Sequence, residues 1–249
     1  MQSTLLCVLT SSITRFGTRQ GVSKPISTDG CTRVFMDVGA NIGVNMRFLY
    51  EAEKYPNTAS MVSMMDKVLG KDRSGVCYYG FEANSAHYTR LQRLKEYFKA
   101  KNVHIWNRPV AAHDRYMTFY HANTKSDYSN EEWGFSATRY TRNGIPVQLK
   151  ALDFPKWFAG MKFDPAVTTI LIKMDIEGSE YEVVAALMAQ GLLCKVHTVT
   201  IEWHARFCRG KLCNVDLPSI TRYLPKLGCN VNFVEQDDES YLHDGQPLH

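Results

Sequence analysis

The pattern of hydrophobic and polar positions divides most of the chain into alternating strands and helices. Short runs rich in β-branched and aromatic residues predict strands at 33–38, 75–83, 102–112, 168–176, 196–204 and 230–236. Apolar residues at helical spacing predict helices at 41–55, 85–101, 180–193 and 219–228. Strands separated by helices of this length favour a parallel sheet that is covered on both faces. We therefore predict an α/β fold with a doubly wound, mostly parallel sheet.

One segment departs from this alternation. The sequences "YMTFYHA" at 116–122 and "PVQLKALDF" at 146–154 predict a β-hairpin inserted around 114–150. Its aromatic residues suit either stacking on a sugar ring or covering the edge of the sheet, and the loop at 126–134 could close over a substrate. These aromatic residues are Tyr116, Phe119, Tyr120, Tyr128, Trp133, Phe135 and Tyr140.

Length and composition favour one globular domain. The chain has 249 residues and 45% hydrophobic content, which fits a single domain with a substantial core. We expect an N-terminal extension at 1–32, a core at 33–235 and a C-terminal tail at 236–249. Residues 56–75 look like an insertion. The apolar runs are too short to span a membrane, so a soluble, cytoplasmic protein is expected.

Charge and cysteine content narrow the choice of partners. The net charge is +4, but Lys and Arg are scattered along the chain, so a nucleic-acid partner is not favoured.

The seven cysteines are odd in number and lie mostly in apolar segments, which predicts reduced core thiols. Cys208 and Cys213 are the one close pair. A local disulfide there is favoured over a metal site if the protein meets an oxidising compartment.

The stretch "DVGANIG" at 37–43 places an acid at the end of a strand, where the chain turns on glycine. Gly39 and Gly43 allow the backbone to turn tightly and to approach a ligand. The pattern lacks the middle glycine of a dinucleotide fingerprint, and Asp37 would repel a pyrophosphate. It would attract a cationic ligand such as S-adenosylmethionine, which carries a sulfonium and an amino group. Glu82, after the second strand, is placed to accept hydrogen bonds from ribose hydroxyls.

Four motifs together resemble the FkbM-type methyltransferases. They are "DVGANIG" at 37–43, "GFEAN" at 80–84, "LIKMDIEGSE" at 171–180 and "TIEWH" at 200–204, and the resemblance covers about 33–205. It implies a class I methyltransferase fold, S-adenosylmethionine as the methyl donor, and O-methylation of a sugar or another small molecule. The family's second acid is commonly followed by proline, whereas Ala83 follows here. The cofactor-binding residues expected on these motifs are Asp37, Gly39, Ala40, Asn41, Gly43, Glu82 and Asp175.

Two pairs of polar residues at strand ends suggest where transfer takes place. Lys173 and Asp175 share one face of their strand, and Glu202 and His204 share one face of the next strand. In register, Lys173 would pair with Glu202, and Asp175 would approach His204. We expect His204 to act as the general base, oriented by Asp175 or Glu202, with Lys173 in the same catalytic group. A purely structural ion-pair network is the alternative.

Three further alternatives stay open at this point. Asp175, Glu202 and His204 could bind a divalent metal, although no sequence feature fixes a full ligand set, so a metal-free site is favoured. The expected partner is a small-molecule or glycan acceptor. A nucleic-acid methyltransferase is disfavoured because the fourth strand ends in "MDIEG", not in an Asn-Pro-Pro-Tyr-like motif. A non-catalytic member that binds the cofactor or a partner protein is the remaining class.

Overall fold

The structure is a computed structural model that describes residues 30–55, 59–99, 101–121, 135–137, 144–164, 166–208 and 210–236. The expected N-terminal extension and C-terminal tail lie almost wholly outside these residues, as does the loop at 126–134 with Tyr128 and Trp133. Tyr140 also lies outside them. Among the described residues, no helix has both the length and the apolar character needed to cross a lipid bilayer.

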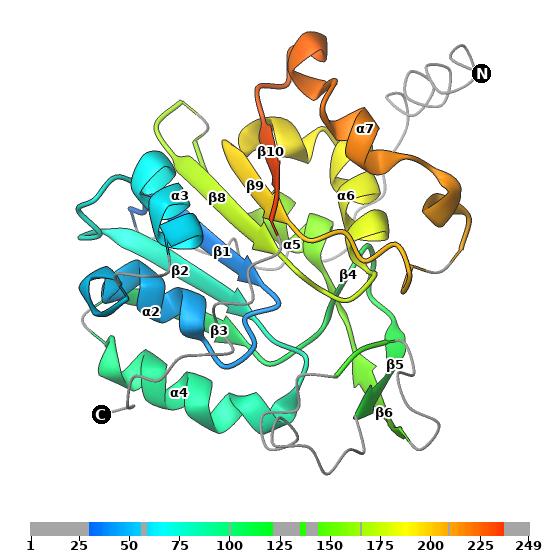
Figure 1. Cartoon of the computed structure of the whole chain (residues 1–249), viewed down its shortest axis with the longest axis horizontal. Coiled ribbons are helices and arrows are strands. Elements are labelled where there is room, and N and C mark those ends of the chain that lie inside the picture. The colour runs from blue at the N-terminus through cyan, green and yellow to red at the C-terminus, as the bar shows by residue number, and fades with distance from the viewer. Residues whose placement is uncertain are drawn as a thin grey trace.

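A six-stranded parallel sheet forms the centre of the protein (Figure 1). Its spatial order is β10-β9-β8-β1-β2-β3, so the chain winds outward in both directions from the boundary between β1 and β8. This arrangement confirms the predicted doubly wound α/β sheet. Ligands of such sheets bind beyond the carboxyl ends of the strands, at the point where the order reverses. The strands are β1 (Arg33–Val38), β2 (Val76–Phe81), β3 (Asn102–Trp106), β8 (Thr169–Met174), β9 (Thr198–Ile201) and β10 (Asn232–Glu235).

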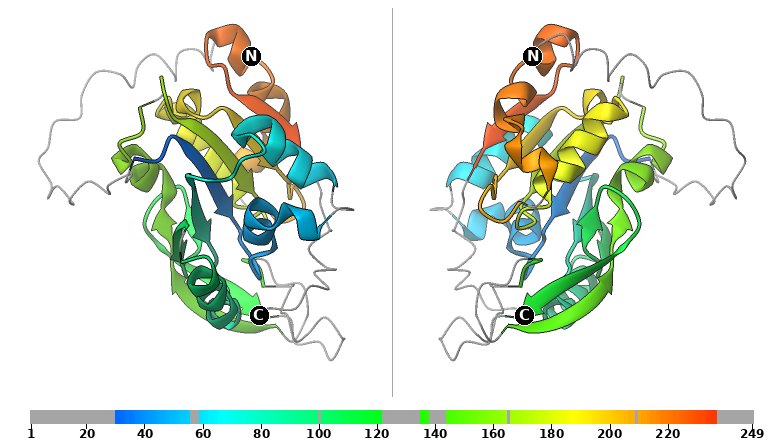
Figure 2. Two further views of the ribbon diagram at one scale, coloured as in Figure 1. Left: turned by 90° about the vertical axis from the view of Figure 1, so that its left-hand side faces the viewer. Right: turned by 90° about the vertical axis from the view of Figure 1, so that its right-hand side faces the viewer.

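Helices cover both faces of this sheet, as the two side views show (Figure 2). Each face of the sheet packs against its helices in a separate hydrophobic core. Successive residues of β1 enter these two cores in turn, because side chains along a strand point to opposite faces. Phe35 packs with α2 (Val44–Tyr50), α3 (Ala59–Leu69) and α4 (Tyr88–Tyr97), whereas Val34 and Met36 pack with α5 (Phe154–Gly160) and α6 (Glu180–Ala189). The shorter helical elements are η1 (Ala52–Lys54), η2 (Ser85–His87), η4 (Leu192–Lys195), η5 (Lys211–Asn214), α7 (Leu217–Thr221) and η6 (Leu224–Leu227).

The predicted hairpin is present. Strands β5 (Tyr116–His121) and β6 (Ile145–Lys150) pair antiparallel, and they lie beyond the carboxyl ends of the central strands (Figure 1). The predicted strand at 102–112 is wrong in part, because it divides into β3 and a two-residue strand, β4 (Val110–Ala111), that pairs with β7 (Leu152–Asp153). Pro109 lies between them and has no N–H to continue the ladder of β3.

Two helices of the structure, α3 and α5, are not among those that the hydrophobic pattern predicts. The interpretation of 56–75 as an insertion is incomplete, because α3 fills much of it and buries Met61, Met65 and Leu69, which are four residues apart. The second missed helix is α5. Its N-cap is Asp153, whose side chain accepts the N–H of Lys156. Both helices carried recognisable signals, a helical period in one and a capping acid in the other.

Six cysteines form three disulfides, so the prediction of reduced core thiols is wrong. The pairs are Cys31–Cys77, Cys194–Cys229 and Cys208–Cys213, with Cα–Cα distances of 6.0, 4.7 and 5.6 Å. The local pair, Cys208–Cys213, is the one that the sequence indicated. Cys7 lies outside the described residues. Disulfides form and persist in oxidising compartments and are rare in the cytosol of mesophiles.

Candidate active site

The turn after β1 packs directly against the end of β8. Gly39 has φ +91°, and a Cβ atom at this position would lie 1.8 Å from the carbonyl oxygen of Asp175. The N–H groups of Gly39 and Ala40 both donate to the carbonyl of Phe81, at 3.0 and 2.9 Å. Gly39 is therefore required by the packing of the protein itself, before any ligand is considered.

Glu82 holds this turn from the end of β2. Its carboxylate accepts the N–H of Asn41 at 2.7 Å through Oε2 and the N–H of Asn84 at 2.7 Å through Oε1. Asn41 adopts a left-handed backbone, with φ +49°. The contact with Glu82 explains how the loop maintains a conformation that is uncommon for a residue other than glycine.

A cavity opens over the turn and the strand ends. Its lining includes Gly39, Asn41, Glu82 and Asp175, which are four of the seven expected cofactor-binding residues. Asp37, Ala40 and Gly43 are not among the described residues that line it. Gly43 instead lies against α4, where an added Cβ would meet the side chains of Leu91 and Leu94. Two hairpin aromatics of the described part, Phe119 and Phe135, also reach the cavity.

Polar atoms at the cavity are available to a ligand. Within the described part of the chain, the buried Oδ1 atom of Asn41 has no hydrogen-bond partner. A carboxylate oxygen has two lone pairs, so Glu82 can accept further hydrogen bonds beyond the two that it takes from the backbone. An adenosine ribose offers hydroxyl donors to such acceptors. The residues present therefore fit a nucleoside-bearing ligand.

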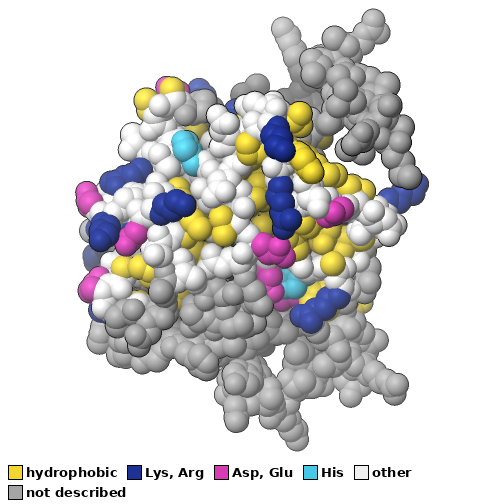
Figure 3. Space-filling view, turned by 45° about the horizontal axis from the view of Figure 1, so that its top comes forward, with side chains coloured by type: hydrophobic (Ala, Val, Ile, Leu, Met, Phe, Trp, Pro, Cys, Tyr) yellow, Lys and Arg dark blue, Asp and Glu magenta, His cyan; other side chains and the backbone are white. Residues whose placement is uncertain are grey.

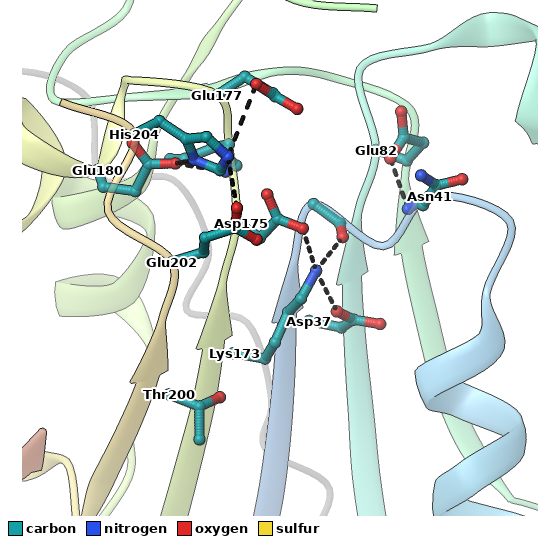
Figure 4. A network of polar contacts seen from close by, with 12 residues as sticks. Asp37, Asn41, Glu82, Lys173, Asp175, Glu177, Glu180, Thr200, Glu202 and His204 are labelled. Carbon is teal, nitrogen blue, oxygen red and sulfur yellow. Dashed lines mark hydrogen bonds and ion pairs between the residues drawn. The ribbon is translucent and has the colours of Figure 1, made fainter. Parts of the chain in front are cut away.

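Lys173 joins β8 to the turn after β1 (Figure 4). Its Nζ atom donates to the carbonyl of Gly39 at 2.7 Å and lies 3.2 Å from Asp175 and 3.8 Å from Asp37. The expected pairing of Lys173 with Glu202 is wrong, because the register of β8 and β9 sets Lys173 opposite Thr200. Lys173 therefore ties the turn to the strand end.

Burial and neighbouring charges have opposite effects on the pKa values of Asp37 and Lys173. Burial raises the pKa of Asp37 to about 6, although the Lys173 ammonium and the Tyr78 hydroxyl, which donates at 2.8 Å, oppose the shift. Burial lowers the pKa of Lys173, but the charges of Asp175 and Asp37 outweigh this effect and raise it overall. Lys173 therefore stays protonated at neutral pH and supplies the positive charge for both acids.

His204 lies among carboxylates (Figure 4). Its Nδ1 atom is 3.0 Å from Glu180, and its Nε2 atom is 2.9 Å from Glu202 and 3.8 Å from Glu177. Ligand atoms of Asp175, Glu180 and His204 all lie within 4.8 Å of one another. The expected approach of Asp175 to His204 is therefore confirmed, and Asp175 connects this cluster to the cavity.

The carboxylates change the charge state of the imidazole. Burial alone lowers the pKa of His204, but hydrogen bonds to Glu180 and Glu202 and the charge of Glu177 outweigh it and raise the pKa to about 11. In this arrangement the ring is protonated at neutral pH. The expectation that His204 titrates near neutrality as a general base does not agree with these surroundings.

Two acids beside His204, Glu180 and Glu177, are not among the site residues that the sequence predicts. Glu180 is fully buried at the start of α6 and accepts the N–H groups of Ile176 and Gly178, each at 2.8 Å. Glu177 lies between Ile176 and Gly178 in the chain, and its φ of +57° is a strained conformation for glutamate. The available signal was an acid in the first turn of a helix that follows a strand end, where free backbone N–H groups favour negative charge.

The chain is similar to a known protein family over most of its length. The sequence profile described as "Methyltransferase FkbM domain" matches residues 37–231. No curated protein matches the chain. A similar solved structure is the crystal structure of methyltransferase FkbM from Methylobacillus flagellatus KT, at 14% identity and a TM-score of 0.40; the match covers 81% of this chain and 38% of that chain. The profile spans most of the sequence and contains all four motifs, and the chain therefore belongs to the FkbM methyltransferase family.

Proposed function

We propose that the protein transfers a methyl group from S-adenosylmethionine to a hydroxyl oxygen of a sugar or another small molecule. One observation carries this proposal. Asp175 lines the same cavity as Gly39, Asn41 and Glu82, and it also lies within 4.8 Å of a ligand atom of His204. The proposed cofactor site and a cluster of proton-accepting groups are thus adjacent. Methyl transfer needs this adjacency, because an acceptor must be held in line with the donor.

The residues that would hold the cofactor are Glu82, Asn41 and Asp175. Glu82 would accept hydrogen bonds from the ribose, and the unpaired Oδ1 atom of Asn41 would gain a donor. When bound, S-adenosylmethionine supplies a methyl group on a positively charged sulfur. The carboxylates of Asp175 and Glu177 line the cavity and favour a cationic ligand there. Lys173 acts as a positioning residue, because it fixes Asp175 against the turn.

Glu177 is the group that we propose to receive the acceptor's proton. It lines the cavity, its side chain is 26% exposed, and its strained backbone points to a functional constraint. Both ring nitrogens of His204 face carboxylates, Glu180 on one side and Glu202 on the other. His204 therefore holds Glu177 and Glu202 in position, a role that replaces the general base expected from the sequence.

The disulfides bear on where such an acceptor is found. Three cross-links among the described residues favour an oxidising compartment over the cytoplasm that the sequence suggested. The exposed hairpin aromatic Tyr116 can stack on a sugar ring. A glycan acceptor is therefore favoured within the proposed function.

Nucleic acid is a weaker candidate for the acceptor. On the face shown in Figure 3, the basic side chains are spread out and form no continuous stripe. Binding to a phosphate backbone depends on such a concentration of positive charge. Carboxylates at the proposed transfer site would also repel a polyanion.

A methyl-transfer assay tests this function. The full chain is incubated with S-adenosylmethionine labelled in its methyl group and with three acceptor sets: sugars with free hydroxyls, phenols and RNA. We expect label on oxygen in the sugar set and none on RNA, with turnover in Glu177→Gln reduced by about 10²-fold, the lower end of the usual contribution of a positioned base. Label on base nitrogen or carbon would contradict the proposal, as would full turnover in Glu177→Gln.

A further inference from the structure

We propose that a second cavity, beside the cofactor cavity, binds the acceptor as one uncharged sugar ring. This cavity has a volume of about 280 Å³ and opens between strand β5, the turn at 177–179 and the disulfide-closed segment 208–213. The volume is near the lower end of the range for small-molecule sites, about 300 Å³, which suits a single ring. The inference rests on the proposed function, because it names the class of acceptor and the residues that would hold it.

The turn at 177–179 borders both cavities. Glu177 and Ser179 line the cofactor cavity and also line the second cavity. A methyl donor in one cavity and a hydroxyl group in the other would therefore meet at this turn, as an in-line transfer requires. Glu177, which we propose as the proton acceptor, lies where the hydroxyl of the acceptor would lose its proton.

One wall of the second cavity is fixed by close packing and by a disulfide. Gly178 has φ +103°, and a Cβ atom there would lie 2.7 Å from the carbonyl carbon of Phe207 and 2.9 Å from the backbone nitrogen of Cys208. The N–H groups of Phe207 and Cys208 both donate to the carbonyl of His204, at 2.9 and 3.1 Å. The disulfide to Cys213 then closes this segment. A wall that is already in place lowers the ordering cost of binding a ligand.

The lining of the second cavity combines apolar side chains with hydroxyl groups. Tyr116 and Leu212 line it although they are 71% and 37% exposed, so each has apolar surface that a ligand can cover. Thr118 and Ser179 add hydroxyl groups. The hydroxyl oxygen of Thr118 accepts the side-chain amide of Gln148 at 2.7 Å, so its own hydrogen can point to a ligand. A sugar ring offers an apolar C–H face to an aromatic ring and hydroxyls to polar partners, and it therefore matches this lining.

The charges around the second cavity favour an uncharged sugar over an acidic one. Among the described residues that line it, Arg115 is the one cation, and its guanidinium pairs with Glu182. Glu177 lies 3.8 Å from His204, whose single positive charge is shared with two closer carboxylates. The lining therefore carries a net negative charge, which repels phosphate and uronate groups.

Saturation-transfer NMR tests the second cavity without any methyl transfer. The full chain is mixed with the methyl glycosides of glucose, galactose and mannose, with glucuronate as the acidic comparison and phenol as the aromatic one. We expect saturation transfer to at least one neutral glycoside and none to glucuronate or phenol. Affinity for that glycoside should be about three- to tenfold weaker in Tyr116→Ala, the range expected for one aromatic contact. Tyr223→Ala is the matched control, because Tyr223 is exposed and is not among the described lining residues.

A second variant tests the cavity by filling it. Thr118→Phe would place a phenyl ring in the cavity, at a strand position where an aromatic residue is tolerated. We expect it to abolish glycoside binding. Its affinity for S-adenosylmethionine should equal that of the wild type, because Thr118 is not among the described residues that line the cofactor cavity. Circular dichroism confirms that each variant is folded.

The outcomes separate this inference from the proposed function. Absence of glycoside binding up to tens of millimolar, in protein that transfers methyl groups to oxygen of another acceptor, would overturn the inference and leave the proposed function intact. Equal glycoside affinity in wild type, Tyr116→Ala and Thr118→Phe would also overturn it, as would preferential binding of glucuronate or phenol. Glycoside binding that Thr118→Phe abolishes, in protein that fails to bind S-adenosylmethionine, would support the second cavity and contradict the proposed function.

Discussion

Replacing Gly39 by alanine is expected to destabilise the protein by about 4 kcal/mol, the sum of backbone strain and an unrelieved steric overlap. The new Cβ would lie 1.8 Å from the carbonyl oxygen of Asp175, and backbone atoms on both sides would have to move. A loss of this size is a large part of the stability of a typical domain. Chemical denaturation monitored by circular dichroism measures it.

Gly75 provides a matched control. Its φ of +73° carries a similar backbone penalty, but no atom lies within 4 Å of a Cβ placed there. Gly75→Ala should therefore cost about 1 kcal/mol, the penalty of a left-handed residue alone. Equal losses in the two variants would show that the contact with Asp175 does not constrain the turn. A substitution of Gly39 is consequently a poor probe of cofactor binding, because it perturbs the fold first.

Replacing His204 by alanine is expected to reduce turnover by about 10²-fold or more, the usual contribution of an organised proton-transfer group. Its removal leaves the fully buried Glu180 without a charged partner and allows Glu177 and Glu202 to repel each other. Affinity for S-adenosylmethionine should stay within threefold, since His204 is not among the described residues that line the cavity. Steady-state kinetics and calorimetry separate the two effects.

Two further variants, a control at another histidine and a lysine at position 204, test how His204 acts. His113→Ala alters an exposed histidine and should retain wild-type turnover. His204→Lys keeps a positive charge but offers a different donor geometry. Partial recovery in His204→Lys would support a positive charge that holds the carboxylates, whereas full loss would show that the donor geometry of the imidazole is also required. Near-normal turnover in His204→Ala would contradict this role.

The alternation of strands and helices was predictable from the sequence because the hydrophobic period changes clearly between them. The strand ends were therefore also predictable, and with them the positions of Asp37, Glu82 and Asp175 near one edge of the sheet. The spacing of hydrophobic residues does not determine the register between neighbouring strands. Lys173 lies opposite Thr200 because of where β8 and β9 begin, and no local pattern reports that offset.

Other features depended on contacts that the sequence does not encode locally. Glu180 acquires its role from backbone N–H groups of the preceding turn and from a histidine 24 residues away. The disulfides Cys31–Cys77 and Cys194–Cys229 join residues 46 and 35 positions apart. Cysteine connectivity cannot be deduced from spacing alone, so only the short Cys208–Cys213 pair was visible in the sequence.

Calorimetric titration of S-adenosylmethionine into the full chain and into Glu82→Gln tests the central claim most directly. Glutamine retains one oxygen acceptor, which replaces one of the two carboxylate oxygens that accept the N–H groups of Asn41 and Asn84, and circular dichroism checks that the variant is folded. We expect one site in the wild type and affinity more than tenfold weaker in the variant, a loss of at least about 1.4 kcal/mol of binding free energy. NAD should produce no binding heat. Equal affinity for S-adenosylmethionine in the two folded proteins, or binding of NAD alone, would contradict the account.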